Sequence, residues 1–299
     1  MINYNMFCES IKKEVANQLP GHTVEIQEMG KINSVKKNGL VIQEKNKNVS
    51  PIIYLEEYYQ EYLRVNKFHE IAKEIVLFYK NVKDGKFDTE KLMNFEDIKN
   101  KIGLKLINTE KNREFLKTVP SIPFLDLSII FYVLIGANAE GIAGMNIINE
   151  HMINWNVTVQ DLWKCALKNS SEMFPAVLQT MTDVLKAMME TKKEGNLLVE
   201  NTGERDGMYV LSNQLKSYGA SCIVYPDVPE MIAEILKRDY YIIPSSIHEI
   251  IIIPIYSEME PEELDDMICE VNSAHVAEEE VLSDHCYRYI RAEKQVVMR

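Results

Sequence analysis

The side chains most able to do chemistry gather in one polar stretch between two very apolar segments. Residues 240–254 run from Tyr-Tyr-Ile-Ile to Ile-Ile-Ile-Ile-Pro, and Ser245, Ser246, His248 and Glu249 lie between these ends. A hydroxyl, an imidazole and a carboxylate are the groups that acid–base and nucleophilic catalysis use. Neighbouring residues of a regular strand point to opposite faces, so His248 and Glu249 are not expected to pair. The simpler interpretation is a tight turn whose serine hydroxyls bind backbone amides.

A second polar group lies further along the chain, at Ser283-Asp284-His285. An aspartate beside a histidine can form a proton relay, and His275 and His248 supply imidazoles that could join His285 on a metal ion. The spacing of these histidines matches no metal motif. A capped turn before a final strand is therefore the preferred interpretation.

Cys222 is a third candidate, because its thiol could act as a nucleophile with His248 as the base. A cysteine in an apolar segment such as 219–224 is more often a small buried hydrophobic residue. The five cysteines form no Cys-x-x-Cys pair and their number is odd. This pattern argues against a disulfide framework and favours reduced thiols in a cytoplasm.

Motifs of the common nucleotide-binding and hydrolytic enzymes are absent. The chain contains no GxxxxGK[ST], no GxGxxG after an expected strand, no HExxH and no GxSxG. We therefore predict no cofactor, and the balance of these observations leans away from an enzyme.

Acidic charge is concentrated in the last third of the chain. The net charge of the 299 residues is −12, and residues 200–299 alone carry 20 acidic and 8 basic side chains. Such a field repels phosphate backbones, so nucleic-acid binding by this part is disfavoured. An acidic helix is expected at 260–272, where it could receive a basic protein partner. Its expected outer face is Glu262, Glu263, Asp265, Asp266 and Glu270, and its expected inner face is Leu264, Met267, Ile268 and Val271.

No segment is expected to enter a membrane. The N-terminus lacks a basic region followed by an apolar stretch, so no signal peptide is predicted. The most apolar segment, 124–139, contains Asp126 and is shorter than the roughly 20 apolar residues that a spanning helix needs. A cytoplasmic location is expected.

The N-terminal part predicts a helix, a strand, a hairpin and two to three further helices. Phe7, Ile11 and Val15 recur at helical spacing, and the alternation over 23–27 is typical of a strand. Asn38-Gly39 favours a two-residue hairpin turn. Further helices are expected from Ser50-Pro51, with the stripe Leu55, Tyr58, Tyr59 and Tyr62, and over the stripe Ile71, Ile75, Phe78, Tyr79 and Val82.

The C-terminal part predicts more strands. Strands are expected at 127–135 and 144–148, which we predict to pair, and at 196–200, 208–212, 220–225, 240–243 and 250–255. A capping box at Thr158-Val159-Gln160-Asp161 predicts a helix start. A helix over 227–237 is expected to turn Met231, Ile232, Ile235 and Leu236 inward.

Together these elements predict an α+β protein. We expect residues 120–299 to hold a mixed or antiparallel sheet with packed helices, and residues 1–119 to form a smaller helical and hairpin region. The boundary is placed near 118–123, where Pro120 and Pro123 coincide with a change from charged to apolar sequence.

Five phrases of the chain resemble a known family. They are Ser50–Leu55, Tyr209–Asn213, Tyr218–Cys222, Pro244–Glu249 and Glu279–Asp284. In combination they are similar to the domain of unknown function 5688 of gut-dwelling Firmicute bacteria, over almost the full length. The resemblance implies a bacterial cytoplasmic protein and supplies no activity or catalytic residue.

Three functions stay open from the sequence. The leading hypothesis is a binding or regulatory protein that contacts a partner protein through its acidic C-terminal third. The first alternative is a hydrolase in which Ser246 and His248 converge with Asp284 or His285 across the sheet. The second is a small-ligand-binding protein with its ligand between the N-terminal helices and the sheet.

Overall fold

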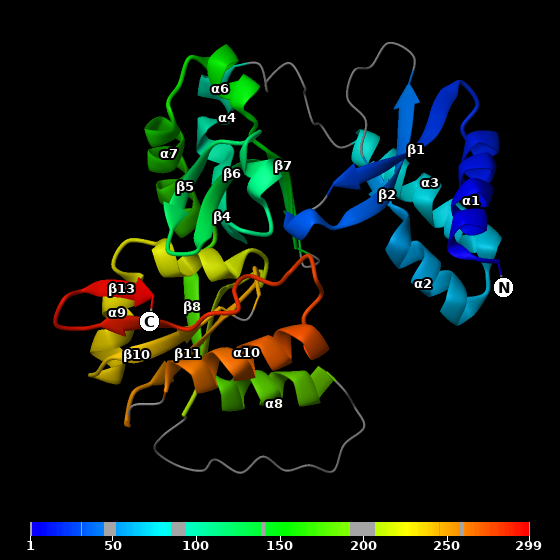
Figure 1. The fold of residues 1–299 in the computed structure, drawn as a ribbon. Coiled ribbons are helices and arrows are strands. Elements are labelled where there is room, and N and C mark those ends of the chain that lie inside the picture. The colour runs from blue at the N-terminus through cyan, green and yellow to red at the C-terminus, as the bar shows by residue number, and fades with distance from the viewer. Residues whose placement is uncertain are drawn as a thin grey trace. The chain divides into compact units, whose positions relative to one another are not determined.

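The structure is a computed structural model that describes residues 2–30, 32–44, 52–84, 94–138, 141–191, 207–244, 246–257 and 260–298. The chain divides into two compact units, Met1–Leu92 and Met93–Arg299. In the described part of the chain, antiparallel strands form three sheets, and helices pack beside them (Figure 1). This arrangement confirms the α+β class. In these same parts, no helix is both long enough and apolar enough to span a membrane.

In its described residues, the N-terminal unit packs three α-helices with one small sheet. Its elements are α1 (Tyr4–Gln18), β1 (His22–Gly30), η1 (Ile32–Ser34), β2 (Lys36–Glu44), β3 (Ile52–Tyr54), α2 (Leu55–Val65) and α3 (Phe68–Asp84). The strands pair in the order β1-β2-β3. As predicted, Phe7, Ile11 and Val15 are fully buried, and they pack with Leu55 and Ile75 in the core of this unit.

The predicted hairpin turn at Asn38-Gly39 is wrong. Both residues lie inside β2, where Asn38 pairs with Glu28 and its amide donates to Glu56 Oε1 at 2.7 Å. The chain reverses earlier, where Asn33 and Ser34 adopt positive φ angles of 62° and 60°. The pairing of β2 with β1 on one side and β3 on the other outweighs the local preference of Asn-Gly for a turn.

The helix predicted from Ser50-Pro51 begins later. Ser50 and Pro51 lie outside the described residues, but residues 52–54 form β3 and α2 starts at Leu55. In α3 the predicted stripe is correct for Ile71, Ile75 and Tyr79, whereas Phe78 is 45% exposed. Phe78 follows Ile75 by three residues and sits at the edge of the buried stripe.

The C-terminal unit begins with a four-stranded sheet. Its elements are α4 (Phe95–Ile98), η3 (Lys99–Lys101), β4 (Ile102–Asn108), α5 (Arg113–Leu116), β5 (Ser121–Phe124), β6 (Leu127–Asn138), β7 (Gly141–Asn146), α6 (Asn149–Trp155) and α7 (Val159–Met173). Strand β6 pairs with β4, β5 and β7, so the pair predicted at 127–135 and 144–148 is confirmed. The capping box at Thr158 and Asp161 is also confirmed at the start of α7.

A second, six-stranded sheet follows in the same unit. Its strands and helices are β8 (Ala176–Thr180), α8 (Met181–Thr191), β9 (Tyr209–Asn213), η4 (Gly219–Val224), α9 (Val228–Leu236), β10 (Tyr240–Ile243), β11 (Ile250–Pro254), α10 (Pro261–His275), β12 (Tyr287–Ile290) and β13 (Gln295–Met298). The described strands are ordered β13-β12-β10-β11-β9-β8. The strand expected at 196–200 lies outside the described residues.

Alternation along β10 directs the two faces of this sheet to different helices. Tyr241 and Ile243 pack with Leu264 and Ile268 of α10. Tyr240 points the other way, and its hydroxyl donates to the carbonyl of Pro229 in α9 at 2.9 Å. Successive side chains of a strand alternate between faces, so α10 and α9 cover opposite faces of β10.

The strand predicted at 220–225 is wrong, because residues 219–224 form the short 3₁₀ helix η4. The apolar residues there are buried as expected, with Ala220 and Cys222 at 0% exposure. A short apolar run does not distinguish a buried strand from a buried helical turn. Here Tyr218, with φ 54°, turns the chain into η4.

Both helices that flank the six-stranded sheet expose apolar side chains that the sequence predicted to face inward. On α9 only Ile232 is fully buried among the predicted set, while Met231 is 58% and Ile235 is 62% exposed. On α10 the exposed ones are Met267 at 57% and Val271 at 47%. Each helix buries a narrower stripe than its apolar residues could fill.

The boundary between the two units lies at a different position from the predicted one. The predicted boundary at 119–120 falls after β4 and before β5, yet both strands pair with β6 in one sheet. The compact division lies at Leu92 and Met93 instead. The prolines at 120 and 123 therefore mark a bend at the edge of a sheet.

Candidate functional site

Four of the five segments that resemble the family meet around His248. The Ser212 hydroxyl of β9 donates to the His248 carbonyl oxygen at 2.8 Å. The Ile247 amide donates to the Glu280 carbonyl at 2.9 Å, and the Ala220 amide of η4 donates to the Ile247 carbonyl at 3.3 Å. We call this meeting point the His248 hub.

The imidazole of His248 has two polar neighbours. Its Nδ1 accepts a hydrogen bond from the Tyr218 amide at 3.3 Å, and its Nε2 lies 3.4 Å from Glu280 Oε1. Because Nδ1 is an acceptor, a neutral His248 carries its proton on Nε2, toward Glu280. The side chains of His248 and Glu280 are 31% and 40% exposed, so this pair lies at the surface of the hub.

Tyr218 is the centre of an aromatic group within the hub. Its ring stacks with the His248 ring at 6.0 Å and 12°, and it lies 5.6 Å from the Tyr132 ring. The Lys105 ammonium sits 4.6 Å from the Tyr218 ring centroid, although Lys105 is only 6% exposed. A cation over an aromatic face is stabilised by the ring quadrupole. Lys105 therefore helps to hold the Tyr218 ring in position, together with the rings of His248 and Tyr132.

The other candidate residues of this segment form hydrogen bonds within the turn between β10 and β11. Ser246 is 8% exposed, and its Oγ accepts the His248 amide at 3.0 Å, as the turn interpretation expects. The Glu249 carbonyl accepts the Ser246 amide at 3.2 Å. Ser245 lies outside the described residues. These bonds close the turn between β10 and β11.

Cys222 is fully buried, and its thiol donates to the Ser212 carbonyl at 3.4 Å. Burial raises the pKa of this thiol to about 12. Since the thiolate is the nucleophile, a thiol with this pKa is poorly suited to attack at neutral pH. The position agrees with a small buried side chain.

Asp284 and His285 are engaged with α10. Asp284 Oδ1 accepts from Asn272 Nδ2 at 2.8 Å, and His285 Nδ1 lies 2.9 Å from Asp265 Oδ2. The other Asp265 oxygen accepts the Cys286 amide at 2.8 Å. His248 and His285 are therefore paired with different carboxylates, Glu280 and Asp265. Asp265 is half-buried, so the prediction that it lies on the outer face of α10 is wrong.

His275 is exposed in the last turn of α10. Within the described ranges, no three histidine, cysteine, aspartate or glutamate side chains gather closely enough to hold a metal ion. The metal set of His248, His275 and His285 therefore has no further support from the geometry.

The His285–Asp265 pair predicts a small pH dependence of stability. The hydrogen bond that the His285 ring donates to the Asp265 carboxylate raises the pKa of His285 above its ordinary value. The pair therefore stabilises the fold fully below about pH 6.5, and this contribution is lost as the pH rises through the higher folded pKa. We expect less than about 1 kcal/mol, because the His285 side chain is 50% exposed.

Urea unfolding of the wild type and His285→Asn across this pH range measures the effect. The difference in unfolding free energy should shrink as the pH rises. In the Asp265→Asn background the same substitution should show no such trend. A difference that grows with pH would contradict the assignment.

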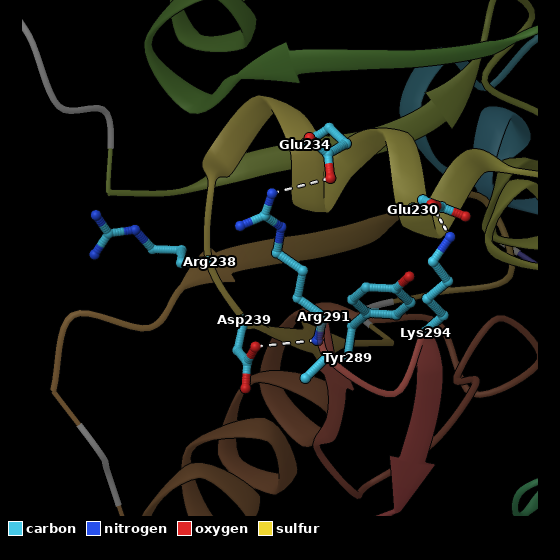
Figure 2. A pocket seen from close by; sticks show the side chains of 8 residues that line it. Glu230, Glu234, Arg238, Asp239, Tyr289, Arg291 and Lys294 are labelled. Atoms are coloured by element: carbon cyan, nitrogen blue, oxygen red, sulfur yellow. Dashed lines mark hydrogen bonds and ion pairs between the residues drawn. The ribbon is translucent and has the colours of Figure 1, made fainter.

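A pocket lies between α9 and the turn that joins β12 to β13 (Figure 2). Its volume is about 480 Å³, and Glu230, Glu234, Arg238, Asp239, Tyr289, Arg291, Ala292 and Lys294 line it. None of the site residues predicted from the sequence lines this pocket. The ligand position expected between the N-terminal helices and the sheet stays a prediction.

The described residues thus define an α+β protein of two compact units, with a polar hub and a charged surface pocket in the second. The chain belongs to the Family of unknown function (DUF5688), whose model matches residues 4–291. No curated protein and no solved structure matches the chain.

Sequence reasoning missed three residues of the hub, Lys105, Tyr218 and Glu280. Lys105 carried a usable signal, because it is the one charge in the apolar run Ile102–Ile107 and a buried strand rarely holds a lysine. Tyr218 and Glu280 carried a weaker signal, because they lie in two of the phrases that resemble the family, Tyr218–Cys222 and Glu279–Asp284. Their roles depend on contacts with His248, which lies about 30 residues from each.

Proposed function

We propose that the protein is a binding module that receives a basic, amphipathic protein segment on helix α10. The observation that carries this proposal is a surface of one helix on which exposed apolar side chains and carboxylates lie together. Met267 and Val271 are exposed one turn apart, and the exposed carboxylates Glu263, Asp266 and Glu270 flank them.

The rotation of α10 is set by its buried side. Leu264 and Ile268, at 1% and 4% exposure, pack on β10 with Tyr241. Residues four apart share a helix face, so Met267 and Val271 form one continuous, half-exposed apolar strip along the edge of this buried stripe. Exposed apolar side chains grouped in this way, with a polar rim, are typical of protein contact sites.

Charge and apolar area would contribute differently to such a contact. Carboxylates around the strip attract a basic segment and speed its association, whereas the desolvated apolar side chains hold it. The acidic excess of residues 200–299 adds to the same field. A partner with leucine-like side chains on one face and lysine or arginine beside them fits both features.

The hydrolase alternative receives less support. A catalytic His248 would have to exchange its bonds with the Tyr218 amide and Glu280 for bonds with a serine and a substrate. Ser246 Oγ already accepts a backbone amide within its own turn.

A bacterial cytoplasmic location is part of the proposed function. The five free cysteines support this location.

Binding to a synthetic amphipathic peptide of leucine and lysine tests the proposal. The peptide should bind the full chain, and the double variant Asp266→Lys, Glu270→Lys should weaken binding by about tenfold or more. Met267→Ser with Val271→Ser should weaken it as well. Fluorescence anisotropy of the labelled peptide measures both effects.

Two controls make the test specific. The variant Glu110→Lys, Glu114→Lys reverses two charges that also belong to exposed ion pairs and should leave the affinity unchanged. A scrambled peptide of the same composition without an apolar face should bind weakly. Equal loss in both charge variants, or equal binding of both peptides, would refute a site on α10.

A further inference from the structure

We propose that the pocket between α9 and the β12–β13 turn binds a small zwitterion, a free amino acid or a dipeptide, with an ammonium and a carboxylate group. This site is separate from the proposed contact surface on α10. The proposal depends on how charge is distributed over the walls of the pocket.

Acidic side chains of α9 face basic side chains of the β12–β13 turn (Figure 2). Arg238 and Asp239 also line the pocket, and the Arg238 guanidinium lies over the Tyr256 ring. Glu230 and Glu234 lie four residues apart on α9, so both carboxylates share one face of that helix. Arg291 and Lys294 stand opposite on the turn after β12. Arg291 Nη2 reaches Glu234 Oε1 at 3.0 Å, and Lys294 Nζ pairs with Glu230. The four groups form two parallel ion pairs across the pocket.

The base of the pocket is rigid. The ring of Tyr289 is 2% exposed and stacks with Tyr240 at 5.0 Å and 14°. Asp239 fixes the turn, because its Oδ1 accepts the Arg291 amide at 3.0 Å and its Oδ2 accepts from Arg288 Nη2 at 2.8 Å. The backbone that presents Arg291 is thus held in place, while the Arg291 and Glu234 side chains are 43% and 62% exposed.

The cross-pocket ion pairs are easily exchanged. The side chains of Arg291, Glu234, Lys294 and Glu230 are between 41% and 65% exposed, and ion pairs so exposed contribute little to stability. A ligand carboxylate can take the place of Glu234 at Arg291, where planar bidentate bonds are available. The ligand ammonium can then pair with the released Glu234 carboxylate.

This exchange selects a zwitterion over a singly charged ligand. A carboxylate alone leaves the α9 wall without a cation, and an amine alone leaves the turn without an anion. A molecule with both groups keeps Arg291, Glu234, Lys294 and Glu230 paired. The volume of about 480 Å³ lies within the roughly 300–1,000 Å³ range of small-molecule sites, which suits an amino acid or a dipeptide.

Three matched probes test the charge requirement on the full chain. L-norleucine carries both groups, hexanoate lacks the ammonium, and pentylamine lacks the carboxylate. Titration calorimetry should show norleucine binding about tenfold tighter than either single-charge probe, as one charge-assisted contact predicts. Alanyl-alanine, titrated in the same way, reports whether a longer zwitterion is preferred. The affinity for norleucine should fall as salt is added.

Variants then assign the binding to this pocket. Arg291→Gln and, independently, Glu234→Gln should each weaken norleucine binding about tenfold. Arg113→Gln, which removes an arginine from an exposed ion pair elsewhere in the same unit, should leave it unchanged. Thermal melting checks that each variant is folded. Absence of saturable zwitterion binding, equal affinity for the three probes, or unchanged affinity in both pocket variants would overturn the proposal.

Discussion

Replacing Gly219 by alanine should strongly destabilise the C-terminal unit, by about 3 kcal/mol, at the upper end of the usual range for overpacking. A methyl group at this position would lie 2.5 Å from the His248 carbonyl oxygen and 2.8 Å from the Asn213 amide nitrogen, and would also overlap Ser212 Oγ. Two of these three atoms belong to the backbone, which cannot rotate away.

The same contact makes this substitution informative about the hub. Ser212 Oγ donates to the His248 carbonyl directly beside Gly219, so any shift that admits the methyl group disturbs that bond. The Tyr218 amide, which precedes Gly219, donates to the His248 ring. Loss of stability should therefore be accompanied by a change in the NMR signal of the His248 imidazole.

Urea unfolding, followed by circular dichroism, measures the loss of stability. Gly136→Ala is the matched control, because among the described residues, its own chain neighbours aside, no atom comes within 4 Å of the added methyl group. It should be neutral or slightly stabilising, since alanine loses less backbone entropy than glycine on folding. Equal stability of the two variants would show that the hub is loosely packed around Gly219.

Replacing Leu264 by alanine should cost about 2–5 kcal/mol, the usual range for a fully buried leucine. Leu264 is 1% exposed and belongs to the cluster of Tyr241, Ile268 and Cys286 that joins α10 to the sheet. The lost side chain leaves a cavity under the helix, because the strands below it cannot collapse to fill the space.

Met267→Ala is the control on the same helix. Its side chain is 57% exposed, so truncation should change stability by no more than about 0.5 kcal/mol. Both variants are compared by urea unfolding at one pH. A large cost for Met267→Ala, or a small one for Leu264→Ala, would mean that α10 is rotated from the orientation on which the proposed contact surface depends.

Local patterns predicted many elements because short-range physics decides them. Period-two alternation identified β1, helical spacing identified α1 and α10, and continuous apolar runs identified β10 and β11. The capping box at Thr158 and Asp161 was equally predictable, because its bonds close within three residues. The errors lie where a distant partner outweighs a local preference, as at Asn38-Gly39, which β1 and β3 hold in an extended strand.

For the candidate site around His248, the sequence indicated the polar segment but not the groups that contact it. The segment around His248 does contain the polar hub, yet Glu280, Tyr218 and Lys105 are its partners. Asp265 was expected on the outer face of α10, and instead it binds His285 and the Cys286 amide. A carboxylate that pairs across elements has the same sequence signature as one that faces water.

The sequence by itself determined the α+β class, the acidic character of the last third and most buried stripes, because composition and periodicity act over a few residues. Only the tertiary structure decided which apolar side chains stay exposed on α9 and α10, and which charges face one another across the pocket. Both depend on how a helix rotates against its sheet and on which distant turn lies beside it. Those are properties of packing between segments, which spacing along one segment does not encode.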